Sequence, residues 1–151
     1  MEFDDFRDID FDRLSQLPPD LKPLWGIMTL QHMIEHLGDN FRISNGTLQS
    51  QVYTPAEKVE QLKRVSLLSD REFPKGITSP LVPGEPLPYR TAGVKEAIIS
   101  LAEEMVRFEQ HFAGRNGHTE NHPVFGPLIY NEWILYQNKH FRHHFKQFGL
   151  V

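Results

Sequence analysis

Residues 94–112, VKEAIISLAEEMVRFEQHF, show the clearest structural pattern in the chain. Their apolar side chains recur at alternating intervals of four and three residues, at Val94, Ile98, Leu101, Met105, Phe108 and Phe112. Because an α-helix turns once in about 3.6 residues, this spacing places the apolar side chains on one face, as in the seam of a helix bundle. The pattern predicts a helix over residues 94–112, closed by Arg115-Asn116-Gly117.

Further helices are predicted on both sides of this segment, and no strand alternation of comparable length competes with them. They cover residues 11–16, the segment from the N-cap Thr29 to Asn45-Gly46, a short stretch after the capping box Thr54-Pro55-Ala56-Glu57, and residues 128–147. A loop through His122-Pro123 leads into the last helix. We therefore expect an all-α fold, a four-helix bundle with an additional short helix.

The segment from Ser69 to Arg90 is predicted to be a long loop. It contains five prolines and two glycines, which interrupt regular structure. Loops of this length in compact domains often form lids or walls of binding sites, and a crossover between distant ends of a bundle explains the segment equally well.

Composition indicates a single domain, residues 1–151, and excludes several classes of function. The net charge of −4 provides no basic field for nucleic acid or for an anionic membrane surface. Cysteine is absent, which excludes disulfides and thiolate ligands and is compatible with a reducing compartment. No signal peptide follows the acidic start Met1-Glu2-Phe3-Asp4-Asp5, and no segment approaches membrane-spanning length, so we expect a cytoplasmic location.

Three histidines cluster in residues 139–146, KHFRHHFK. His140 and His144 stand four residues apart, so on a helix their side chains project from one face and can share a metal ion. They also share the face of Trp133, and imidazoles carried into an apolar interior need a partner. The alternative is that both are solvated near a helix C-terminus, next to Arg142 and Lys146.

A catalytic zinc-type site needs about three protein ligands, so a third donor must come from another segment. The best-placed candidate is His36, at the boundary of the apolar face of the helix that begins after Thr29. His32 lies further toward the polar face. His143 projects away from His140 and is interpreted as a residue behind the ligands or on the surface.

The sequence also contains other arrangements of polar residues. Residues 32–36 match H-x-x-E-H, a zinc protease pattern, but the match is short and both histidines would face away from the apolar stripe. Candidate bases are Glu35 and Glu132, although Glu132 is too far from His140 to reach the same ion and is expected to cap or pair at the start of its helix. Tyr136 and Gln137 could line the site, and Gln137 could equally be a satisfied polar group at a helix crossing. His111 and His118 have no partner at ligand spacing and are expected to be exposed.

The chain resembles the DinB-like superfamily, which includes the YfiT-type proteins, and specifically the branch named for domain of unknown function 1569. The resemblance covers nearly the whole chain and rests on the blocks Trp25-Gly26-x-Met28-Thr29-x-Gln31-x-Met33-Ile34-Glu35-His36-Leu37, His122-Pro123-x-Phe125-Gly126-x-Leu128, Glu132-Trp133 and His140-x-x-His143-His144-x-x-Gln147-Phe148-Gly149. The long proline-rich loop and the crowded His143-His144 end depart from the better-understood branches.

The resemblance implies a four-helix bundle with one histidine on the second helix and an H-x-x-x-H pair on the last. By position these are His36, His140 and His144, the expected ligands of one divalent ion, zinc or nickel. It also implies a metal-dependent hydrolase, or a transferase that uses a low-molecular-weight thiol, acting on a small molecule, in a protein that forms a homodimer. No catalytic residue is assigned. The rival interpretation is a non-catalytic metal-binding or interaction domain of the same fold.

Overall fold

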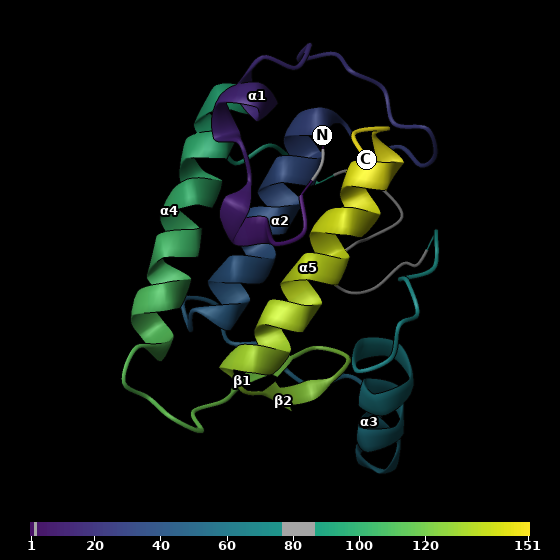
Figure 1. The fold of residues 1–151 in the computed structure, drawn as a ribbon, viewed down its shortest axis with the longest axis vertical. Helices are drawn as coiled ribbons and strands as arrows, with labels where there is room; N and C mark the ends of the chain where they lie inside the picture. The colour runs from purple at the N-terminus through teal and green to yellow at the C-terminus, as the bar shows by residue number, and fades with distance from the viewer. Residues whose placement is uncertain (2, 77–86) are drawn as a thin grey trace.

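The computed structural model describes residues 1, 3–76 and 87–151, which are mostly helical with one short hairpin. The elements, drawn in Figure 1, are the 3₁₀ turn η1 (Phe6–Asp8), α1 (Phe11–Ser15), α2 (Leu30–Ser44), α3 (Ala56–Leu62), the π-helical turn η2 (Lys63–Leu67), α4 (Val94–Phe112), β1 (Glu120–His122), β2 (Gly126–Leu128) and α5 (Tyr130–Gln147). Among these described residues no helix is both long enough and apolar enough to cross a membrane.

The predicted helices all form, with small differences at their ends. The bounds predicted for α4 are confirmed. The N-cap predicted at Thr29 is also confirmed, because its side chain accepts a hydrogen bond from the backbone N–H of His32 at 3.1 Å. The capping box predicted at Thr54 is wrong. Pro55, extended at ψ 136°, takes the N-cap position, so the helix begins one residue later and no side chain caps it.

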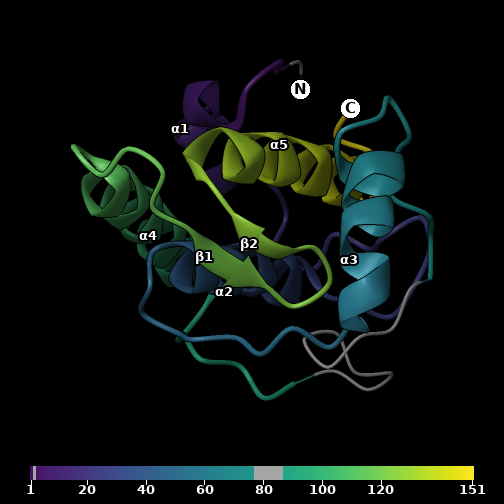
Figure 2. The same cartoon turned by 90° about the horizontal axis from the view of Figure 1, so that it is seen from below.

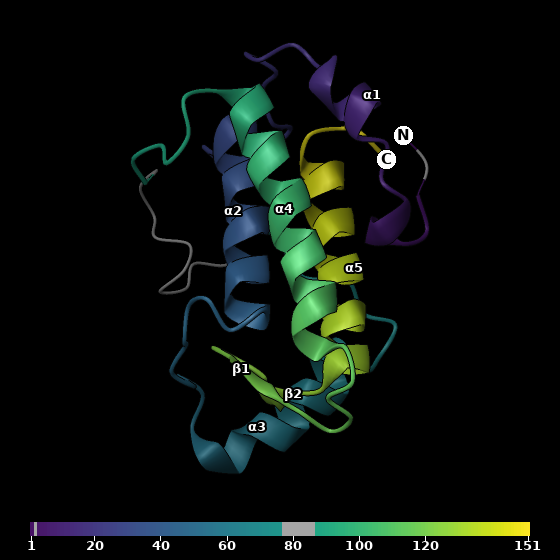
Figure 3. The same cartoon turned by 90° about the vertical axis from the view of Figure 1, so that its left-hand side faces the viewer.

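Three long helices, α2, α4 and α5, enclose the core. Figure 3 shows α2 and α4 side by side, and the packing between these two is the most extensive between helices. In Figure 2, which views the molecule from below, α5 lies across from α2 and α4. The short helix α3 stands apart from these three long helices. The N-terminal segment, rather than a fourth long helix, lies between α4 and α5, with α1 packed against α4 and η1 against α5 (Figure 1).

The N-terminal segment contributes the central aromatic side chain of the core. Phe6 is 1% exposed, and its ring lies 5.2 Å from that of Phe41 on α2, 6.4 Å from that of Phe108 on α4 and 5.8 Å from that of Phe141 on α5. Its backbone N–H donates to Oδ1 of Asn138 on α5 at 2.8 Å. Phe6 and the turn η1 that carries it are therefore an integral part of the helical core.

A two-stranded hairpin forms where the sequence predicted only a loop before the last helix. β1 pairs antiparallel with β2, with Glu120 opposite Leu128 and His122 opposite Gly126. Nδ1 of His122 accepts hydrogen bonds from the backbone N–H groups of Val124 at 3.0 Å and Phe125 at 3.1 Å, which holds the turn. Strands of three residues are too short to show an alternating pattern, which explains the error.

Much of the predicted loop from Ser69 to Arg90, residues 77–86, lies outside the described residues. Its described flanks dock on two different helices. On one side the Lys139 ammonium of α5 donates to the carbonyl oxygens of Ser66, Ser69 and Arg71. On the other side Oε1 of Glu35 on α2 accepts from the backbone N–H groups of Arg90 at 2.9 Å and Thr91 at 2.8 Å.

Candidate metal centre

Three imidazoles from two helices converge inside the bundle. Nε2 of His140 on α5 lies 2.8 Å from Nε2 of His36 on α2 and 3.1 Å from Nε2 of His144, one turn further along α5. The three nitrogens all lie within 4.8 Å of one another. The four-residue spacing places His140 and His144 on one face of α5, and the packing of α2 against α5 brings His36 to them.

All three imidazoles are held in the neutral form. His140 and His144 are buried, at 5% and 6% exposed, and burial lowers the pKa of both well below its usual value. Burial, with a smaller effect of nearby His143, lowers the pKa of His36 to about 4. Neutral imidazoles offer the lone pairs that a metal ion requires.

The tautomer of His144 is set by a chain of hydrogen bonds that ends on a backbone carbonyl. The amide nitrogen of Gln147 donates to the carbonyl oxygen of Trp25 at 3.1 Å, which turns its Oε1 toward Nδ1 of His144 at 2.8 Å. Because Oε1 can only accept, Nδ1 carries the proton and Nε2 presents its lone pair to the other two imidazoles. Partners of this kind orient the ligand and raise its basicity in metal sites.

One metal ion would satisfy the three Nε2 atoms better than hydrogen bonds between the imidazoles do. Because Nε2 of His144 accepts, Nε2 of His140 must carry a proton, and this single N–H faces both His36 and His144. One metal ion would instead bind the lone pairs of all three Nε2 atoms. Tetrahedral zinc with Zn–N bonds of about 2.0–2.1 Å places its ligand nitrogens about 3.3 Å apart. The distances of 2.8 Å and 3.1 Å from Nε2 of His140 to the other two Nε2 atoms therefore need to open by only a few tenths of an ångström. The donor set therefore fits a divalent ion of the zinc type.

Polar atoms continue from this trio along the buried face of α5. Within the described residues, Nδ1 of His140, Nε1 of Trp133, both amide atoms of Gln137 and Nε2 of His122 are buried without a hydrogen-bond partner. Tyr136 stacks on His140, with ring centroids 5.2 Å apart, and donates to Oδ1 of Asn40 at 2.7 Å. The interior beside the histidines is thus polar, and Gln137 is not the satisfied polar group that the sequence also allowed.

The H-x-x-E-H interpretation is wrong. His32 does not approach His36, because its Nδ1 lies 2.8 Å from the hydroxyl of Thr29 and its Nε2 lies 2.7 Å from the carbonyl oxygen of Leu87. Glu35 is not free to act as a base, since the hydroxyl of Thr91 also donates to its Oε1, at 2.6 Å. These hydrogen bonds lower the pKa of Glu35 against the opposing effect of burial, so the carboxylate anchors the chain at residues 90–91.

Glu132 occupies the position predicted for it. Its Oε1 accepts from the backbone N–H of Ile129 at the start of α5, and its Oε2 pairs with the ammonium of Lys63 at 2.5 Å. His143 lies behind the ligands, with Nδ1 at 3.2 Å from the carbonyl oxygen of Phe73 and its ring centroid 5.0 Å from that of His144.

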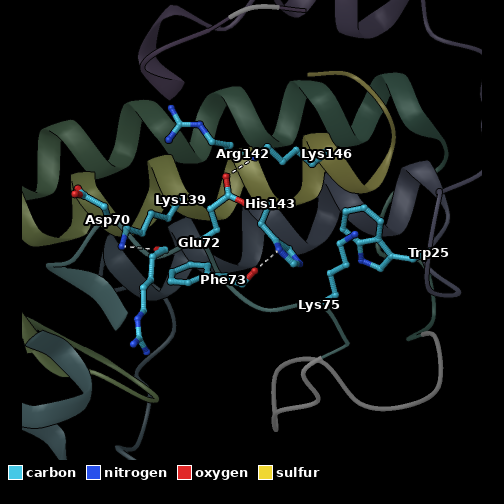
Figure 4. Close-up of a pocket in the computed structure, with 10 residues that line it drawn as sticks. Trp25, Asp70, Glu72, Phe73, Lys75, Lys139, Arg142, His143 and Lys146 are labelled. Carbon is cyan, nitrogen blue, oxygen red and sulfur yellow. Dashed lines mark hydrogen bonds and ion pairs between the residues drawn. The ribbon is translucent and has the colours of Figure 1, made fainter. Parts of the chain in front are cut away.

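A small cavity of about 80 Å³ opens beside His143 on the outer side of α5 (Figure 4). Cationic side chains outnumber acidic ones among the residues that line it, which are Trp25, Asp70, Arg71, Glu72, Phe73, Lys75, Lys139, Arg142, His143 and Lys146. Figure 4 shows Lys139, His143 and Lys146 projecting from the same helix toward the segment of residues 70–75. The ammonium of Lys75 lies 4.1 Å from the ring centroid of Trp25.

The expectation that His111 and His118 are exposed and isolated is wrong. Both lie against Glu120 at the other end of the bundle, half-buried. His111 lies in a helix, His118 in a loop and Glu120 in a strand. The spacing of these three residues in the sequence follows no pattern that predicts a cluster.

A mostly helical chain in which three neutral imidazoles converge is a candidate metal-binding protein. The model of a family described as Protein of unknown function (DUF1569) matches residues 72–149, which is just over half of the chain, and the chain belongs to this family. The match includes His140 and His144 but not His36. Comparisons with curated proteins and with solved structures return no match.

Proposed function

We propose that His36, His140 and His144 bind one divalent ion, zinc or nickel, in a metal-dependent enzyme that acts on a small molecule. The reaction is a hydrolysis or the transfer of a low-molecular-weight thiol. The observation that carries the proposal is the convergence of three neutral Nε2 atoms within 4.8 Å, one of them oriented by Gln147. The DinB-like resemblance supports the same three ligands.

The donor set favours a catalytic centre over a structural one. Within the described residues the group holds three histidines and no fourth donor. Structural zinc sites are closed by four protein ligands, whereas catalytic sites keep a position for water or substrate. A non-catalytic metal-binding domain, in which the ion only ties α2 to α5, is the rival function. It requires a fourth donor, and among the described residues no further His, Asp or Glu side chain joins this group.

In the proposed reaction the ion would supply Lewis acidity, and side chains of the protein would hold and orient it. A divalent ion with three neutral ligands keeps its full charge, so it acidifies a water or thiol and polarises a substrate carbonyl. His36, His140 and His144 position it, and Gln147 keeps the proton on Nδ1 of His144. The chain has no cysteine, so a thiolate nucleophile has to come from a cosubstrate.

The substrate we propose is small and negatively charged. The cavity of Figure 4 is lined by His143, whose ring centroid lies 5.0 Å from that of His144, and by Lys75, Lys139 and Arg142 among other cations. The three ligands themselves do not line it. Cationic side chains around a cavity of this size can hold a carboxylate or a similar group.

Metal content and thermal stability test the metal centre. Because an ion that binds only the folded state raises the melting temperature, zinc or nickel should raise it in wild-type protein. His36→Ala and His140→Ala should each lose one equivalent of metal, measured by elemental analysis after dialysis, together with most of that rise. His32→Ala and His143→Ala are the matched controls and should keep both. The proposal is overturned if the controls lose the metal and His36→Ala keeps it.

Activity assays then separate an enzyme from a binding domain. Metal-loaded protein is tested against ester and amide panels, and separately against electrophiles with added thiols. Turnover that disappears on chelation and in His144→Ala supports the enzyme and, by the panel in which it occurs, identifies the chemistry. Turnover that survives both treatments overturns the proposed mechanism.

A further inference from the structure

A second group of potential metal ligands lies at the C-terminal end of α4 and is made of other residues than the centre described above. Nε2 of His111 lies 2.9 Å from Oε1 of Glu120, and Nε2 of His118 lies 2.8 Å from the same oxygen. The three donor atoms all lie within 4.8 Å of one another. We propose that His111, His118 and Glu120 form a second divalent-metal site, independent of the three-histidine centre.

The backbone builds this cluster from three elements. His111 lies in the last turn of α4, and the loop that follows turns back through hydrogen bonds from Arg115 N–H to Phe112 O at 3.0 Å and from His118 N–H to Arg115 O at 3.1 Å. Gly114 and Gly117 take φ values of +69° and +77° in this loop, a region that residues with a side chain rarely adopt. Glu120 is then held as the first residue of β1.

The cluster has a closed side and an open side. Gly46, at the end of α2, approaches so closely that a Cβ there would lie 2.9 Å from Cε1 of His111 and 3.4 Å from Oε1 of Glu120. The ring of Phe112 lies against both imidazoles, with centroids 5.3 Å and 5.7 Å away. The side chains of His111, His118 and Glu120 nevertheless remain 20–34% exposed, so the cluster is open to water on one side.

Two imidazoles and one carboxylate are a recurrent donor set for Zn²⁺ and Fe²⁺. The carboxylate offsets part of the ion's charge, and the exposed side leaves positions for water. The present N···O distances of 2.8 Å and 2.9 Å are a few tenths of an ångström shorter than those between ligands of tetrahedral zinc. His118 lies in a loop, so a small rotation of its side chain supplies the difference.

The same geometry could also serve as a purely hydrogen-bonded cluster, in which two N–H groups donate to Glu120. Glu120→Gln separates the two roles. A carboxamide oxygen still accepts from both imidazoles, but it is neutral and a much weaker metal ligand. A metal site is lost in this variant, whereas a hydrogen-bonded cluster is kept.

The test is the stoichiometry and spectrum of Co²⁺ and Zn²⁺ bound to the full chain. Wild-type protein should bind two equivalents, while His118→Ala and Glu120→Gln should each bind one and keep the ion of the three-histidine centre. His140→Ala should bind one, and His140→Ala combined with Glu120→Gln none. The visible Co²⁺ spectrum of His140→Ala should be that of the site with a carboxylate ligand. Thr119→Ala, a change at an exposed neighbour, is the control and should bind two.

The proposal is overturned if Glu120→Gln and His118→Ala bind as much metal, as tightly, as Thr119→Ala. If His118→Ala fails to fold by far-ultraviolet circular dichroism, Glu120→Gln decides alone. Failure at this site leaves the result for His36→Ala unaffected, so the two metal proposals fail separately.

Discussion

Gln147 accepts a hydrogen bond from Nδ1 of His144 at 2.8 Å and so determines which ring nitrogen of that histidine faces His36 and His140. The direction of this bond follows from its other partner, the carbonyl oxygen of Trp25, which can only accept. A residue that cannot touch the ion thus prepares the lone pair that would bind it.

Gln147→Leu should weaken binding of zinc about 10- to 100-fold, the usual effect of removing such a partner. Gln147→Glu keeps an acceptor for Nδ1 and should retain most of the affinity. Competition with a chromophoric chelator measures both. Equal affinities for the Leu variant and the wild type would show that His144 needs no orientation by Gln147.

Gly26→Ala should weaken metal binding although Gly26 is not a ligand. Gly26 has φ +80°, and a Cβ there would lie 2.9 Å from the amide nitrogen of Gln147. We expect a loss of about 1–2 kcal/mol of stability from the left-handed backbone, together with weaker metal binding because Gln147 is displaced. Chemical denaturation and the chelator assay measure the two effects.

Gly76→Ala is the matched control for that change. Gly76 has a similar φ of +74°, but no atom of the part of the chain that the structure describes lies within 4 Å of the Cβ position. It should lose a comparable amount of stability and keep its metal affinity. If both glycine variants lose metal equally, general destabilisation rather than displacement of Gln147 is the cause.

Tyr136→Phe should destabilise the protein by about 1–3 kcal/mol, because it leaves Oδ1 of buried Asn40 without its donor. Tyr130→Phe removes a hydroxyl that donates to Glu109 at 2.8 Å in an exposed position, where water replaces the bond, and should change stability by less than about 0.5 kcal/mol. Urea denaturation of the two variants compares them directly, and the reverse order would contradict the role given to Asn40.

Acid should weaken the anchoring of the N-terminal segment. The hydrogen bonds and charge of Arg7 lower the pKa of Asp5 to about 2 from its usual 3.8. Below pH 4 the unfolded chain therefore binds a proton that the folded chain does not, and the stabilisation present above pH 4 is lost as the pH falls toward 2. Asp5→Asn should lower stability at pH 6 by about 1 kcal/mol, given the partial exposure of the pair.

The difference between Asp5→Asn and wild type should shrink between pH 4 and pH 2.5, as measured by urea denaturation at each pH. Asp4→Asn alters the exposed neighbour and should show no such change. A difference that stays constant with pH would mean that Asp5 acts only as a cap of η1.

The sequence predicted the long helices well because each carries a sustained apolar period and a recognisable end. It predicted that His36, His140 and His144 would meet, and the structure brings them together, although metal binding itself stays a prediction. The homodimer, the thiol cosubstrate and the cytoplasmic location also stay predictions. Gln147 could have been found in principle, since it lies three residues after His144 on the same helix.

Other features were beyond reach for physical reasons. The hairpin has strands of three residues, and its turn is held by a histidine ring rather than by a typical turn residue. The cluster around Glu120 depends on a loop that reverses the chain at two glycines, which no periodicity encodes. The burial of Phe6 was missed because an acidic segment without a helical period gave no sign of a core position.

The contact between Phe6 and Asn138 spans a sequence separation of 132 residues. Phe6 enters a space whose walls are Phe41, Phe108 and Phe141, the last of them on α5. Until Phe141 has left the ribosome, this ring has no finished core to occupy, so a residue that is made early is buried late. Burial of Phe6 therefore waits for the synthesis of α5, and the nascent chain keeps this aromatic side chain exposed to water until then.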